Sequence, residues 1–135
     1  MSTLSNTDLT VADANITTLK DGSGNNPSTP ADILQGRAKA WVKLNGTGTI
    51  AVAASYNVTS ISDLGTGNYR VTWATDFNSI EYCVSATAGD SSAANERMCS
   101  ISEVHTVTTS ACKVFDKAGS AIDDDPVMFI AFGAQ

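Results

Sequence analysis

The stretch from Arg37 to Phe77 alternates between apolar and polar residues and is broken by glycine-rich turns. Successive side chains of a strand point to opposite faces of a sheet, so a period of two is typical of half-buried strands. The alternation is cleanest after Asn68, where Tyr69, Val71, Trp73 and Phe77 share one face. We expect this face to form the centre of the core, and the pattern favours an all-β fold.

The rest of the chain continues this pattern less regularly, and no segment shows a convincing helical period. Strands are expected at 37–44, 49–53, 56–61, 69–77, 81–88, 97–102, 104–108, 112–115 and 127–132. Eight or nine short strands separated by short turns predict an antiparallel β-sandwich. The length of 135 residues suits one domain, which we place at residues 37–135.

Residues 1–36 differ from the rest because they contain no aromatic residue and include a polar Gly/Pro/Ser/Asn tract. Such a tract cannot bury enough apolar surface to order itself. We therefore predict an extended N-terminal arm whose residues 21–36 form a linker. Its scattered apolar side chains need a surface to pack on, either the main domain or a neighbouring subunit, and are the candidate attachment residues: Leu4, Leu9, Val11, Ile16 and Leu19.

The net charge of −6 argues against a nucleic-acid partner, which requires clustered cations. Arg37, Lys39 and Lys43 do lie close together, on the same strand face as Trp41. A solvated face beside a partner's acidic groups is the simplest interpretation. Aromatic residues are enriched at interfaces, so Trp41 with Lys39 and Lys43 is also the candidate subunit interface.

Targeting signals are not visible in the sequence. No apolar run approaches the roughly 20 residues of a membrane span, and the N-terminus has neither the basic region nor the apolar core of a signal peptide. We expect no membrane insertion and no secretion.

Three cysteines, Cys83, Cys99 and Cys112, lie at spacings that fit neither a disulfide framework nor paired zinc ligands. Each falls in an expected strand, so we predict buried, unpaired thiols. A disulfide between two of them, or a thiol at a subunit interface, remains the alternative.

Other reactive side chains form no recognisable catalytic pattern. His105 is the single histidine, and no nucleophile motif accompanies it. Glu81, Glu96 and Glu103 could supply a glycosidase pair, but scattered glutamates at strand ends are typical of solvated surface. The acidic run 123–126 could hold calcium, yet it lacks the spacing of an EF-hand loop and is expected to be a solvated turn. We assign no catalytic, cofactor-binding or metal-binding residue, and no cofactor.

Two linked blocks carry a resemblance: AKAWVKLNGTGT at 38–49 and SYNVTSISDLGTGNYRVTW at 55–73. Together they resemble a small β-sandwich domain of bacteriophage virion proteins, especially tail fibres. The resemblance implies a non-enzymatic, homotrimeric module exposed on the virion, made in the host cytoplasm and linked to host recognition.

Three functions follow as expectations. The first is a tail-fibre or receptor-binding subunit that contacts a host glycan or protein. The second is a capsid decoration or head-fibre protein that docks on other virion proteins through its arm. A carbohydrate-binding or hydrolytic domain is the third. Contacts with a host or partner are expected in two loops, through Asp90, Ser91, Ser92, Asn95, Asp123, Asp124 and Asp125.

Overall fold

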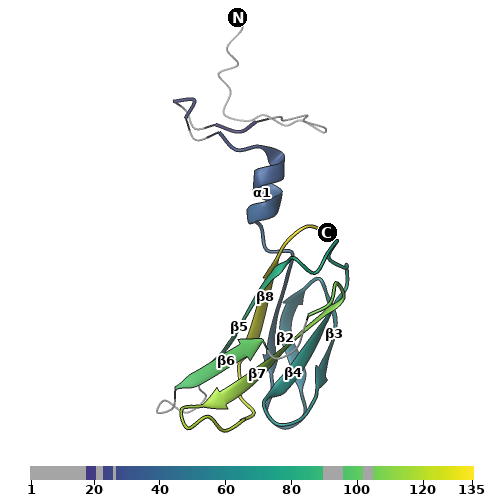
Figure 1. Cartoon of the computed structure of the whole chain (residues 1–135), viewed down its shortest axis with the longest axis vertical. Helices are drawn as coiled ribbons and strands as arrows, with labels where there is room; N and C mark the ends of the chain where they lie inside the picture. Colours follow the sequence, from purple (N-terminus) through teal and green to yellow (C-terminus); the bar gives the residue numbers. More distant parts are fainter. Residues whose placement is uncertain (1–17, 21–22, 26, 90–95, 102–104) are drawn as a thin grey trace, which may run out of the picture. The chain divides into compact units, whose positions relative to one another are not determined.

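A computed structural model describes residues 18–20, 23–25, 27–89, 96–101 and 105–135 of the chain (Figure 1). Eight strands lie in this part: β1 (Ala40–Asn45), β2 (Ala51–Tyr56), β3 (Val58–Asp63), β4 (Asn68–Trp73), β5 (Cys83–Ala88), β6 (Arg97–Ile101), β7 (Thr109–Asp116) and β8 (Val127–Phe132). They form two four-stranded sheets, with orders β2-β1-β8-β5 and β3-β4-β7-β6. Every pairing within the sheets is antiparallel.

The predicted all-β sandwich is confirmed. Alternate residues of β1, β4 and β8 are buried and form one core together with Cys112 and Val114 of β7. The predicted aromatic face of β4 lies at its centre, since Tyr69 and Val71 have no exposed surface and Trp73 has 2%. The facing residues come from the other sheet: Ala40, Val42, Leu44, Val127, Phe129 and Ala131.

Most of the expected strand ends are shifted by one to three residues, and the largest shift is at the end of the strand expected at 69–77. β4 ends at Trp73, and Phe77 reaches the core from the segment that follows. Asn57 explains the end of the strand: its backbone oxygen accepts from Ala74 N at 3.1 Å, and its side-chain Oδ1 accepts from Thr75 N at 2.8 Å. Asn57 itself has φ of 56°, and it also separates β2 from β3. The side chain of Asn57 thus helps to end β4, and its backbone separates β2 from β3.

The prediction of a strand at 104–108 is also wrong over the residues that the structure describes, 105–108. Residues 105–108 lie outside every strand, because the hydroxyl of Thr106 accepts hydrogen bonds from Thr108 N at 3.2 Å and Thr109 N at 3.0 Å. Threonine side chains that bond to nearby backbone compete with sheet pairing in this way.

A short helix replaces part of the expected linker. α1 covers Pro30–Gly36. The Thr29 hydroxyl accepts from Asp32 N at 3.2 Å, while the Asp32 carboxylate accepts from Thr29 N at 2.8 Å. This reciprocal cap, with proline at the first helical position, is a known helix start. The sequence TPAD at 29–32 contains these capping residues and the proline, but a helix of seven residues is too short to show a helical period.

The chain divides into two units at residues 34 and 35, and Gln35–Gln135 holds all eight strands. The predicted boundary falls at 36 and 37. Before the division, Leu19 and Ser28 form an isolated antiparallel bridge with hydrogen bonds of 2.8 and 2.7 Å. In the described residues, no helix has the length and apolar character that crossing a membrane would require.

Candidate interaction surface

The outer face of the sheet β2-β1-β8-β5 carries an exposed apolar band. The register places Trp41 between Tyr56 of β2 and Ile130 of β8, and Ile130 beside Ser85 of β5. In the neighbouring row, Lys43 lies between Ala54 and Met128, and Met128 beside Thr87. Four large apolar side chains of these rows remain exposed: Tyr56 at 52%, Ile130 at 39%, Trp41 at 38% and Met128 at 37%.

An open groove of about 400 Å³ runs over this face. Trp41 and Lys43 of β1 form one side, Ser85 and Thr87 of β5 the other, and Met128 and Ile130 of β8 lie between them. Val42 and Phe129, which belong to the buried core, complete the lining. We call this the β8 groove.

The outer face of the other sheet has a different character. Its rows include Ser62 beside Arg70 and Ala111, and Ser100 beside Lys113. These are small or polar side chains, as expected for a sheet that faces water on one side. At one end of the same face Met98, which is 51% exposed, lies beside Phe115, so this face is mixed, whereas the face around Trp41 carries four exposed large apolar side chains in adjacent rows.

The candidate interface residues lie partly in the β8 groove. Trp41 and Lys43 line it, whereas Lys39 precedes β1, is half-buried, and donates its backbone N–H to Ala131 O at 2.8 Å. The structure thus places Trp41 on an accessible surface and brings Lys43 next to it on the same strand face. That these residues contact another subunit stays a prediction.

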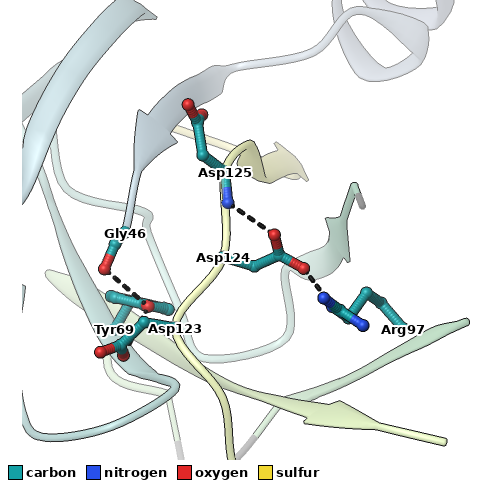
Figure 2. A network of polar contacts seen from close by, with 6 residues as sticks. All are labelled: Gly46, Tyr69, Arg97, Asp123, Asp124 and Asp125. Atoms are coloured by element: carbon teal, nitrogen blue, oxygen red, sulfur yellow. Dashed lines mark hydrogen bonds and ion pairs between the residues drawn. The ribbon is translucent and has the colours of Figure 1, made fainter. Parts of the chain in front are cut away.

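The acidic run before β8 is not the solvated turn that the sequence suggested. Asp124 is 1% exposed, and its carboxylate pairs with the Arg97 guanidinium, whose side chain is 7% exposed. Its second oxygen accepts from Asp125 N at 2.8 Å (Figure 2). Asp124 was expected to contact a host or partner; that prediction is wrong, because its side chain lies inside the domain.

Asp123 is also held by the fold. Its Oδ1 accepts from Gly67 N at 2.7 Å and lies 2.9 Å from the Tyr69 hydroxyl. The same hydroxyl lies 3.1 Å from Gly46 O (Figure 2). Asp123 and Asp125 are half-buried. The run therefore ties the turns after β1 and β3 to the segment that enters β8.

Burial and the Asp123 carboxylate both raise the pKa of Tyr69 above its usual value. Burial disfavours the phenolate, and the neighbouring carboxylate disfavours a second negative charge. The hydroxyl therefore stays protonated and available as a donor within this network.

The fold also explains Gly46, in the turn after β1. A Cβ at Gly46 would meet the Tyr69 ring and lie 2.8 Å from Asp124 O. Close approach of the backbone requires glycine here. The positive φ of this turn belongs to Gly48, at 64°.

The single histidine contributes to packing. His105 Nε2 lies 2.9 Å from Ile80 O, and its ring lies 4.6 Å from the Tyr82 ring. Tyr82 is stacked on Phe77 at 4.0 Å and accepts from Trp73 Nε1 at 3.1 Å. Glu81 and Glu96 are exposed, and Glu103 lies outside the described residues. In the described part of the chain, no group of three or more His, Cys, Asp or Glu could hold a metal.

The cysteines are unpaired, as expected, but only Cys112 is fully buried. Cys83 is exposed because it takes an outward position of β5, in line with Ser85 and Thr87. Cys99 is half-buried, and a hydrogen bond with Cys112 lowers the pKa of Cys99. The same bond and burial raise the pKa of Cys112.

Several predicted contact residues lie outside the described residues: Asp90, Ser91, Ser92 and Asn95 of the loop, and Leu4, Leu9, Val11 and Ile16 of the arm. Leu19 is described and is 46% exposed. Sequence reasoning missed Ser85, Thr87, Met128 and Ile130 as groove residues. Their outward positions could be predicted from two expected strands. That β5, β8 and β1 are neighbours in one sheet could not be predicted.

Comparisons of the chain with protein families, with curated proteins and with solved structures found no match. The site is therefore interpreted from its own geometry.

Proposed function

We propose that this chain is a non-enzymatic structural subunit of a bacteriophage tail fibre or receptor-binding appendage, and that it contacts the host surface. The β8 groove carries this proposal: its open volume of about 400 Å³ lies within the range of ligand sites. The groove combines exposed apolar side chains with two hydroxyl groups and one cation, which suits binding. The resemblance of residues 38–49 and 55–73 supports the virion context.

The rigid position of the groove supports the same function. Its residues project from three adjacent paired strands, and the inward residues of β1 and β8 belong to the core. A site on strands is held more precisely than one on loops. Asp124 lies in the segment that leads into β8, and its buried pair with Arg97 of β6 helps to fix the start of β8.

Labelling of intact particles tests the proposal. Antibodies against the purified chain should decorate the tail tip or fibres of the phage that encodes it. Excess purified chain should also block adsorption of that phage to its host. Labelling of the capsid instead would favour a decoration protein, and particles without label would contradict both virion functions.

The predicted homotrimer is tested separately. Light scattering of the purified chain should give about three times the 14.0 kDa of one chain. A single-chain mass would contradict the trimer without bearing on the position of the protein in the particle.

A further inference from the structure

We infer that the β8 groove binds an acidic polysaccharide, a chain of carboxylate-bearing sugars on the host surface. This inference names the ligand class of the site described above and therefore rests on the proposed function. It is carried by three properties of the groove: an aromatic wall, two hydroxyl groups and a single positive charge.

The aromatic wall suits the apolar face of a sugar ring. Trp41 is 38% exposed and lies beside Tyr56, which is 52% exposed, in one row across the sheet. Pyranose rings present C–H groups on one face, and a tryptophan ring offers a large, rigid apolar plane against which that face can pack. Ile130, the next residue of the row, extends the apolar surface toward β5.

The opposite wall suits the hydroxyl edge of the same ring. Ser85 and Thr87 point outward from β5. Each hydroxyl can donate one hydrogen bond and accept others, which matches the mixed donors and acceptors of a sugar. An apolar surface with a few placed polar groups is the usual composition of a ligand site.

Charge selects the acidic class. Lys43 is the single charged side chain in the described lining of the groove, and no acidic side chain lines it. The whole chain carries a net charge of −6, so the groove lining differs in sign from the chain as a whole. A sugar that packs on Trp41 can place a carboxylate near Lys43, which projects from the same face of β1.

A second copy of the chain fits the face less well. Two copies packed face to face would bring Lys43 against a groove whose described lining holds no acidic side chain, so this charge would have no counter-charge. A carboxylate-bearing sugar supplies one.

Titration of the full chain with two uronate polymers, polygalacturonate and alginate, tests the inference, with dextran as the neutral comparison. Binding is measured by calorimetry and by tryptophan fluorescence, which can report on the groove because Trp73 is buried and Trp41 is accessible. We expect saturable binding to at least one uronate. Trp41→Ala should weaken it by about tenfold or more, and Lys43→Gln by about two- to fivefold.

A matched variant separates the groove from general charge effects. Lys113→Gln removes the same charge from an exposed position of β7 in the other sheet, and it should leave binding unchanged. Equal losses for Lys43→Gln and Lys113→Gln would overturn the inference, as would failure of both uronates to bind. Circular dichroism of each variant confirms that it is folded.

The oligomeric state supplies an independent outcome. If Trp41→Ala converts a larger assembly into single chains, a second copy covers the groove and the inference is wrong. Antibody labelling of particles does not depend on uronate binding. The virion proposal can therefore hold where the polysaccharide inference fails.

Discussion

The acidic run 123–125 and the outer face around Trp41 invert the usual relation between polarity and exposure. Asp124 is charged and is 1% exposed, whereas Trp41 is large and apolar and is 38% exposed. Asp124 is buried because Arg97 and a backbone N–H satisfy its carboxylate. Trp41 is exposed because its register position on β1 points away from the core.

The difference separates structural residues from candidate binding residues. A buried, fully bonded charge contributes to holding one arrangement of loops, and its loss leaves an uncompensated partner. An exposed aromatic side chain contributes less to the fold and is available to a partner. Variants in the acidic cluster should therefore change stability, and variants in the β8 groove should change binding.

The largest expected effect is that of Arg97→Met, which leaves the Asp124 carboxylate buried without its guanidinium. We expect the free energy of unfolding to fall by about 3–5 kcal/mol, as measured by urea denaturation. The double variant Arg97→Met/Asp124→Leu should recover much of this loss, because no buried charge is then left unpaired. A loss below about 1 kcal/mol for the single variant would show that the pair is not a structural element.

Gly46→Ala should have the next largest effect. The added Cβ would overlap the Tyr69 ring and lie 2.8 Å from Asp124 O, so the acidic segment must shift. We expect a loss of about 1–3 kcal/mol in the free energy of unfolding, measured by urea denaturation. Gly36→Ala is the control, because a Cβ there meets nothing within 4 Å; equal effects would contradict the close-approach argument.

Tyr69→Phe removes the hydroxyl between Asp123 and Gly46 and should cost about 1–2 kcal/mol of stability. It also tests a pH dependence. The folded-state pKa of Tyr69 is raised, so its stabilisation is present below the unfolded-state pKa of about 10 and is lost as the pH rises above it. The stability of the wild-type chain should fall more steeply above pH 10 than that of Tyr69→Phe.

Tyr56→Phe is the control for this pH dependence because Tyr56 is 52% exposed. Its stability should follow that of the wild-type chain at every pH. A Tyr69→Phe profile parallel to the wild-type profile would show that Tyr69 does not contribute to the alkaline loss.

The smallest expected effect on stability is that of Lys43→Gln. Lys43 is exposed on the outer face, so the free energy of unfolding should change by less than about 0.5 kcal/mol, measured by thermal and urea denaturation. A larger loss would show that Lys43 is a structural residue rather than a candidate binding residue. The acidic cluster and the β8 groove would then no longer differ in their effect on stability.

Sequence periodicity was enough to predict the fold class and the inner faces of β1 and β4. Ala40, Val42 and Leu44 are buried on one side of β1, as their spacing indicated. The expected strands failed where a side chain bonds to backbone: Thr106 to residues two and three positions on, and Asn57 to Thr75, 18 positions on. The alternation of apolar residues does not report such bonds.

The candidate site could be predicted only in part. Trp41 and Lys43 stood out as an aromatic residue beside a cation, but their partners Ser85, Thr87, Met128 and Ile130 come from strands more than 40 positions away. The same holds for Asp124, whose partner Arg97 lies 27 positions earlier in the chain. Spacing along one strand carries no information about such neighbours.

The sequence by itself determined that the chain forms strands and which side of each regular strand faces the core, because side-chain direction alternates with every residue. Only the tertiary structure decided which strands are neighbours. The order β2-β1-β8-β5 assembles the groove from three strands, and the path into β8 buries Asp124 against Arg97. Sheet order and the burial of a charge arise from long-range pairing, which local patterns do not encode.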